Sequence, residues 1–227
     1  MPEYKTEYQI TPDVMVRTRS PISRRMLPEV QQVLLTSVNF ARNSSKYCTS
    51  KTRQEIAALL DYIPVGNQYG ANFHSTFQRW FNIDPGQTSL RRYRDYMERF
   101  RRICSMLDRE LHEPLELVDS KLLKQLRGRT LGYINTTNEK RRIHLNVKKI
   151  KSGNEWELAN TIVHEATHKF CHTTDSVNIN DKEMDSIPPL RALDNAESLG
   201  YTIIQLYQSH HLGRQLPILR TKWGRRR

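Results

Sequence analysis

The sequence predicts an α+β fold that is mainly helical, with a small sheet or β-hairpin placed immediately before one particular helix. Three observations support this prediction. Apolar residues recur every three to four positions through much of the chain, which is the period of an amphipathic helix. Residues 130–134 and 142–147 are instead typical of two short strands joined by turn residues. Residues 155–171 return to the helical period and contain the motif His-Glu-x-x-His.

The length of 227 residues suits a single domain with tails. We expect a flexible arm at residues 1–20, one domain at residues 21–213 and a basic tail at residues 214–227. The arm is predicted because its residues are polar, with prolines and mixed charges. The three widely spaced cysteines are an odd number, which favours reduced thiols over a disulfide framework.

Before the strands, the helical period predicts four helices. A serine pair, Ser44-Ser45, is expected to end the first helix, and Pro85-Gly86 separates the third from the fourth. Asp119 is expected to cap a further short helix through Leu126. The four predicted ranges are 23–46, 52–62, 74–82 and 88–112.

The helix over 155–171 has a predicted start and a predicted neighbour. Asn154 and Glu157 have the spacing of a capping box, and Gly153 releases the chain before them. After this helix comes a polar segment, and then a last helix that opens at Leu190 or Asp194 and ends at Gly213.

The motif in the 155–171 helix predicts a zinc site. His164 and His168 are four residues apart, so both imidazoles lie on one face and can reach one ion. Glu165 lies about 100° further round the helix, where it can take a proton from a water held by the ion. The alternative is a chance match on an ordinary core helix.

Two histidines leave such a site one protein ligand short. His172 continues the spacing of four, but it is about 12 Å along the axis from His164, too far for one straight helix to bring both to one ion. In an extended form of the motif, a glycine and then a third histidine follow the second histidine, and the third histidine is the missing ligand. This chain lacks that form, because Cys171 and Thr174 occupy the positions of the glycine and the histidine. The remaining candidates are Asp175, Asp181, Asp185, Asp194 and Glu197.

Two blocks of the sequence resemble a known family. The motif is followed by Thr174-Asp175, and residues 188–201 contain Pro-x-x-x-Ala-x-Asn-Ala-acid-Ser-x-x-Tyr in this order. Together these blocks resemble the aspzincins, the group of deuterolysin and the peptidyl-Lys metalloendopeptidases. Arg79-Trp80-Phe81 and Ile143-His144-Leu145 are similar to further family segments, so the resemblance covers about residues 75–207.

The resemblance implies a zincin-like fold and a zinc-dependent endopeptidase that cleaves a protein substrate. It implies Asp175 as the third ligand, with Glu197 as the next candidate in a gluzincin-like arrangement. In this mechanism Glu165 is the general base, and Tyr201 is a candidate for stabilising the oxyanion, unless it is a core tyrosine. Known aspzincins are secreted and carry disulfides. This chain shows neither feature, so it resembles an intracellular or injected relative, such as a bacterial effector toxin.

The formal net charge of +12 indicates either an anionic partner or simply a solvated charged surface. An acidic protein substrate and nucleic acid both fit, and two other functions therefore stay open. One is a protease acting on proteins bound to nucleic acid, and the other is a non-catalytic basic binding protein with structural zinc or none. The basic residues of the helix over 88–112 are Arg91, Arg92, Arg94, Arg99, Arg101 and Arg102, and those of the tail are Arg214, Arg220, Lys222, Arg225, Arg226 and Arg227.

No signal-peptide pattern and no apolar run long enough to cross a membrane is present, so we expect a chain made in the cytosol, or exported without a cleaved signal.

Overall fold

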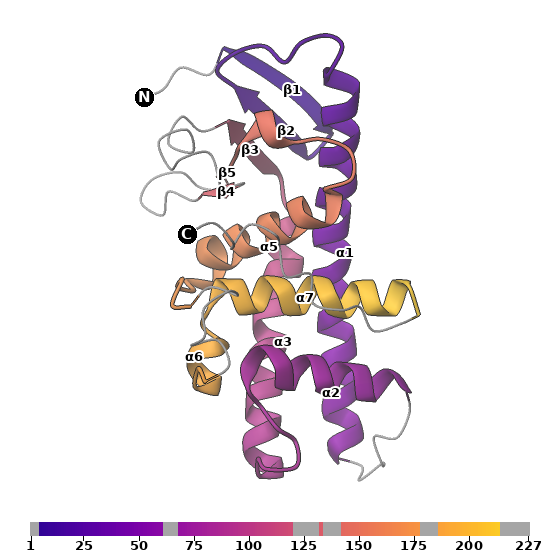
Figure 1. Ribbon diagram of the computed structural model, residues 1–227, viewed down its shortest axis with the longest axis vertical. Helices are drawn as coiled ribbons and strands as arrows, with labels where there is room; N and C mark the ends of the chain where they lie inside the picture. The colour runs from indigo at the N-terminus through magenta and orange to yellow at the C-terminus, as the bar shows by residue number, and fades with distance from the viewer. Residues whose placement is uncertain (1–4, 61–67, 120–131, 134–141, 178–185, 214–227) are drawn as a thin grey trace, which may run out of the picture.

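The structure is a computed structural model, and it describes residues 5–60, 68–119, 132–133, 142–177 and 186–213. The described part is α+β and mostly helical, as predicted, with a sheet at one end of the molecule (Figure 1). The long helix α1 runs from this sheet almost to the opposite end, and α5 and α7 lie across it (Figure 1). The helices are α1 (Leu27–Leu60), α2 (Gln68–Phe81), α3 (Leu90–His112), α5 (Glu155–Cys171), α6 (Pro189–Ala192) and α7 (Ala196–His211).

Within the described residues, the sheet has five strands in the order β1-β2-β3-β5-β4. The two inner pairings, β2 with β3 and β3 with β5, are parallel, and the two outer pairings are antiparallel. The predicted hairpin is therefore present where the structure describes it, because β4 pairs with β5 directly before α5. The strands are β1 (Thr6–Thr11), β2 (Val14–Thr18), β3 (Leu115–Asp119), β4 (Gly132–Tyr133) and β5 (Arg142–Leu145).

The prediction of a flexible arm at residues 1–20 is wrong for the residues that form β1 and β2. Val14 and Val16 alternate with Met15 and are 0% and 1% exposed, so β2 buries one face against the core. Its neighbour β3 was not predicted either. Both strands are short, and each gains its stability by pairing with a strand distant in sequence, which periodicity cannot show. The tail at 214–227 and most of the helix predicted after Asp119 lie outside the described residues.

The first two predicted helices are one continuous helix, α1. Ser44 and Ser45 do not end it, because their hydroxyls donate to the carbonyls of Phe40 and Ala41 one turn earlier. Both serines are fully buried, and these bonds satisfy them inside the helix. The last predicted helix is instead two, α6 and α7, separated at residues 193–195.

Helix α5 has the predicted bounds, and it packs against α1, α3 and α7. The predicted capping box is wrong. The Asn154 side chain makes no capping bond and donates instead to the carbonyl of Lys149. Gly153 has a φ of 89°, and its backbone N–H donates to the carboxylate of Glu155. At its other end the helix stops at His172, whose φ of 57° turns the chain back. No helix among the described residues has the length and apolar character needed to cross a bilayer.

Candidate metal centre

Helix α5 brings the two motif histidines together as the spacing predicts. The Nε2 atoms of His164 and His168 are 3.2 Å apart. Both side chains are largely covered, at 17% and 15% exposure, because α7 and the segment after α5 close over them. The same helical face therefore presents two imidazole nitrogens to one point.

Asp175 joins this pair from the segment after α5. Its Oδ1 atom lies 3.3 Å from His164 Nε2 and 3.0 Å from His168 Nε2. In a tetrahedral zinc site with ligands at about 2.0–2.1 Å, neighbouring ligand atoms are roughly 3.3 Å apart. The three observed separations match this spacing, so the triangle fits a zinc ion. The Asp175 side chain is 61% exposed, which leaves the triangle open on one side.

The other nitrogen of each imidazole is held by an acceptor. His168 Nδ1 lies 2.8 Å from the backbone carbonyl of Thr173, and His164 Nδ1 lies 3.3 Å from Glu197 Oε2. A carbonyl can only accept, so His168 Nδ1 must carry the proton, and a carboxylate favours the same tautomer for His164. In a neutral imidazole each Nε2 then carries the lone pair, whereas a protonated imidazole donates from Nε2 to Asp175. Metal-binding histidines have this pattern of outer partners.

His164 Nε2, His168 Nε2 and Asp175 Oδ1 would repel one another at these distances unless a positive charge lay between them. Burial alone would lower the pKa of His164, but its bonds to Asp175 and Glu197 raise that pKa to about 10. The hydrogen bonds from His164 and His168 hold the pKa of Asp175 far below its usual range. The site thus attracts positive charge, which is either protons on the imidazoles or a metal ion.

Asn195 fixes the segment that carries Asp175. It is fully buried, and its Oδ1 accepts from the backbone N–H groups of Ser176 and Val177 at 3.1 and 3.4 Å. Its Nδ2 donates to the carbonyl of Val177 at 3.0 Å and to the Ser198 hydroxyl at 2.9 Å. One side chain therefore ties the residues directly after Asp175 to the start of α7.

The backbone before Asp175 is tied to the same place. Thr174 forms a parallel bridge with Asn195, since its N–H donates to the carbonyl of Asp194 and its carbonyl accepts from the N–H of Ala196, both at 2.9 Å. Helix α7 also approaches α5 closely at Gly200. A Cβ there would lie 2.8 Å from Asn160 Oδ1 and 3.5 Å from His164 Cβ. The glycine allows α7 to place Glu197 against His164.

Glu165 lies beside the triangle and is only 6% exposed. Burial raises its pKa to about 7, although the charges of His164 and His168 act in the opposite direction. A carboxyl group with a pKa near neutral can both accept and return a proton at physiological pH. This is the behaviour expected of the predicted general base.

The structure separates the other candidates for the third ligand. Glu197 contacts Nδ1 of His164, whereas Asp175 contacts Nε2, so Glu197 lies on the outer side of the cluster. Asp194 points to Arg99, with Oδ1 3.7 Å from Nη2. His172 is exposed at the end of α5 and forms no part of the cluster. Asp181 and Asp185 lie outside the described residues. The group that could hold a metal, within the described part of the chain, is His164, His168 and Asp175, whose ligand atoms all lie within 4.8 Å.

Tyr201 lies on α7 one turn after Glu197. Its ring stacks on Trp80 of α2, with the ring centroids 5.1 Å apart and an angle of 14° between the planes. Trp80 in turn donates from Nε1 to Gln205 Oε1 at 2.7 Å. The ring therefore has a packing role between α2 and α7, and the predicted oxyanion role of its hydroxyl remains a prediction.

Sequence reasoning missed the supporting residues Thr173, Asn195 and Gly200. A glycine in the interior of a predicted helix was a usable signal for Gly200, since such a glycine often has a packing reason. Thr173 acts through its backbone, so its side chain gave no signal. Asn195 stood in the quoted block, but its role depends on a bridge between segments 19 residues apart.

No protein-family model matches this chain, and neither does any curated protein sequence. Among solved structures, the chain is similar to a zinc peptidase from Grifola frondosa, with a TM-score of 0.42 and 12% sequence identity. The similarity covers 74% of this chain and 94% of that one. A likeness this distant assigns no activity, so the interpretation of the site rests on its own side chains.

Proposed function

We propose that this protein is a zinc-dependent endopeptidase. The observation that carries the proposal is the convergence of His164 Nε2, His168 Nε2 and Asp175 Oδ1 at 3.0–3.3 Å, with the buried Glu165 beside them. Two imidazoles and one carboxylate on an open site are the ligand set of catalytic zinc, whereas structural zinc sites are closed and rich in thiolates. In the described part of the chain, none of the three cysteines belongs to this cluster.

His164, His168 and Asp175 would hold the zinc ion. When bound, zinc supplies a Lewis acid that polarises the scissile carbonyl and acidifies a water molecule. Glu197 and the Thr173 carbonyl keep both imidazoles in the tautomer that leaves Nε2 free. Asn195 keeps Asp175 in place, so the three ligand atoms are positioned before any ion arrives.

Glu165 moves the proton. With its pKa near 7, its carboxylate form can take a proton from the attacking water, and the resulting acid can give it to the leaving amine. Burial keeps bulk water away from this carboxylate and favours both transfers. Tyr201 is proposed as the donor to the oxyanion through its hydroxyl, while its ring stays stacked on Trp80.

The sheet offers a place for the substrate backbone. β4 is the outer strand next to β5, and both strands contact α5, which carries the ligands. An extended peptide can add to an outer strand through main-chain hydrogen bonds. A peptide paired with β4 would run over α5, which would bring its carbonyl groups near the metal centre.

The proposal is tested by a matched pair of substitutions on one helix. Glu165→Gln removes the base but preserves shape, and Glu157→Gln makes the same chemical change two turns earlier on α5. Each protein is loaded with zinc and given a random-sequence peptide library, and new N-termini are counted by mass spectrometry. We expect cleavage by the wild type and by Glu157→Gln, and a loss of at least about 10²-fold with Glu165→Gln at unchanged zinc content. Normal cleavage by Glu165→Gln would refute the mechanism.

A further inference from the structure

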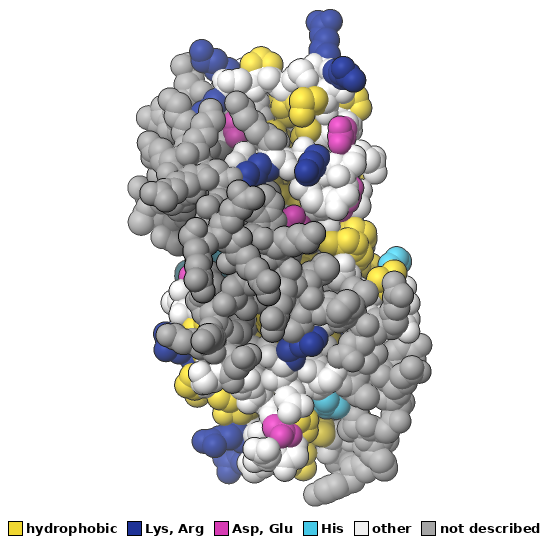
Figure 2. Space-filling view, viewed as in Figure 1, with side chains coloured by type: hydrophobic (Ala, Val, Ile, Leu, Met, Phe, Trp, Pro, Cys, Tyr) yellow, Lys and Arg dark blue, Asp and Glu magenta, His cyan; other side chains and the backbone are white. Residues whose placement is uncertain are grey.

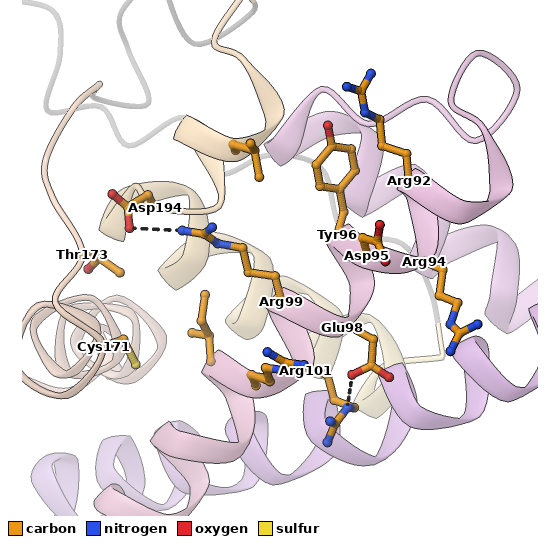
Figure 3. Close-up of a pocket in the computed structure, with 13 residues that line it drawn as sticks. Arg92, Arg94, Asp95, Tyr96, Glu98, Arg99, Arg101, Cys171, Thr173 and Asp194 are labelled. Carbon is orange, nitrogen blue, oxygen red and sulfur yellow. Dashed lines mark hydrogen bonds and ion pairs between the residues drawn. The ribbon is translucent and has the colours of Figure 1, made fainter.

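A hollow of about 930 Å³ lies beside the metal centre, between α3, the end of α5 and α6 (Figure 3). Most of its polar lining comes from α3. The arginines that line it are Arg92, Arg94, Arg99, Arg101 and Arg102, and we call this hollow the arginine groove. These residues lie on the solvent side of α3 because its opposite face is buried.

The arginine groove has more positive charge than its own acids can neutralise. Its acidic residues are Asp95, Glu98 and Asp194, three against five arginines. Glu98 pairs with Arg101 at 2.9 Å and Asp194 with Arg99 at 3.7 Å (Figure 3). The remaining arginines, Arg92, Arg94 and Arg102, are exposed, and no ion pair is seen for them among the residues that the structure describes. Figure 2 shows Lys and Arg side chains towards both ends of the face that it presents.

The arginine groove shares a wall with the metal centre. Thr173 and Asp194 line it, and both belong to the backbone that positions the ligands. The carbonyl of Thr173 holds His168, and the carbonyl of Asp194 holds the N–H of Thr174, next to Asp175. A chain lying in the groove is therefore only one loop away from the site where we propose that peptide bonds are cleaved.

We propose that the arginine groove binds an acidic segment of the protein substrate, at a distance from the bond that is cleaved. This inference rests on the proposed function and names the class of its substrate. Guanidinium groups pair with carboxylates through two parallel hydrogen bonds, so the exposed arginines along α3 select carboxylate side chains. Along α3, Arg92 and Arg99 are about 10 Å apart, which an extended peptide spans in about three residues.

The lining favours a peptide over nucleic acid. A phosphodiester backbone carries a charge at every nucleotide, and the carboxylates of Asp95 and Glu98 would repel part of any continuous run. A peptide can place its acids opposite the arginines and other side chains opposite the acids. Tyr96, Ile103 and the exposed Leu190 add apolar surface that suits such intervening side chains.

The test compares two sets of three substitutions that change the net charge equally. The groove variant is Arg92→Gln, Arg94→Gln and Arg102→Gln. The control variant is Arg24→Gln, Arg25→Gln and Arg53→Gln, which are exposed arginines of α1 or the segment before it. The substrate is a library peptide that the wild type cleaves. It is synthesised with either a run of glutamates or a run of glutamines, placed at the N-terminus in one series and at the C-terminus in another.

We expect the wild type and the control variant to cleave the glutamate form with a kcat/KM about tenfold higher than that for the glutamine form. Most of this difference should be a lower KM, because several exposed ion pairs together strengthen binding of the peptide. The groove variant should lose this preference and cleave the glutamine form as the wild type does. The preference should also shrink between about 0.05 M and about 0.5 M salt. An unchanged preference in the groove variant would overturn the proposal.

A binding measurement separates this proposal from the activity. Anisotropy of a labelled glutamate-rich peptide is measured with Glu165→Gln alone and with the groove substitutions added. Loss of binding in the combined protein supports the proposal even where no peptide is cleaved, and retained binding refutes it. If the groove substitutions abolish binding of a labelled single-stranded oligonucleotide but not of the peptide, the groove is a nucleic-acid site and the proposal is wrong.

Discussion

Glu197 Oε2 lies 3.3 Å from Nδ1 of His164, the nitrogen that faces away from Asp175. This relationship distinguishes the two carboxylates that were candidates for the third ligand. Asp175 faces the inner nitrogens of both histidines, whereas Glu197 faces only an outer one. The first therefore has the position of a ligand, and the second has the position of a support that orients a ligand.

The two roles predict losses of different size. Replacing Glu197 with Gln should weaken zinc binding by about 10–100-fold, the usual effect of losing an outer partner. Replacing Asp175 with Asn should weaken it considerably more, because an anionic ligand is removed from the ion itself. Competition with a chelator of known zinc affinity measures both. If Glu197→Gln proves the more damaging change, the assignments of the two carboxylates must be exchanged.

Asn195→Ala should weaken zinc binding without touching a ligand. The substitution leaves the N–H groups of Ser176 and Val177 and the carbonyl of Val177 without their buried partner, at a cost of about 1–3 kcal/mol each for a group that stays buried and unpaired. The segment should then shift and carry Asp175 away from the histidines. Ser198→Ala is the matched control, since it removes the acceptor of the 2.9 Å bond from Asn195 Nδ2 but leaves the bonds of Asn195 to Ser176 and Val177 in place. Wild-type zinc affinity in Asn195→Ala, measured by the same competition, would show that the segment holds its shape by other means.

Tyr201→Phe separates packing from catalysis. The ring and its stacking on Trp80 are kept, so the melting temperature should change little. If the hydroxyl stabilises the oxyanion, kcat should fall by about 10²–10³-fold while KM stays close to its original value. Steady-state kinetics on one cleaved peptide measure this. A Tyr201→Phe enzyme with full kcat would leave Tyr201 as a packing residue only.

The stability of the helical part should depend on pH through Glu55. This carboxylate of α1 is 4% exposed and pairs with Lys51 and with His74 Nε2, the latter at 3.4 Å. Burial alone would raise its pKa, but the hydrogen bonds from His74 and Lys51 outweigh burial and lower it below the ordinary value of 4.5. The charged form is thus favoured by folding, so this contribution is present above pH 4.5 and is lost as the pH falls through the lowered value.

Urea unfolding of the metal-free protein checks this dependence. The wild type should lose its stability advantage over Glu55→Gln as the pH is lowered from neutral to below 4.5. Removing zinc first keeps the titration of the ligands from dominating both curves, and the difference between the two proteins isolates Glu55. A difference that is the same at every pH would show that the buried pair does not contribute through its charge.

The sequence predicted those parts of the molecule that depend on local spacing. The bounds of α5, the shared face of His164 and His168 and the position of β5 all follow from the periodicity of neighbouring residues. β2 and β3 were missed because both are short, and each has a parallel partner that is distant in the sequence. The serines in α1 were misinterpreted because a hydroxyl can satisfy itself within a helix as well as end one.

The cluster of His164, His168 and Asp175 could be predicted from the sequence, and the residues that hold it in place could not. Resemblance to a family pointed to Asp175, but the choice against Glu197 needed the direction in which each carboxylate faces. The roles of the Thr173 carbonyl and of Asn195 depend on how the segment after α5 folds back onto the start of α7. Such a fold is set by backbone hydrogen bonds, and these leave little trace in the order of side chains.

The central claim is that one zinc ion binds at the point where the two imidazoles and the aspartate meet. Crystals of the zinc-loaded protein, measured on both sides of the zinc absorption edge, test it directly. The account predicts one strong anomalous peak at about 2.0–2.2 Å from His164 Nε2, His168 Nε2 and an oxygen of Asp175, with a fourth position free of protein atoms. No peak there, or a peak bound by Glu197 in place of Asp175 or closed by a fourth side chain, would contradict it.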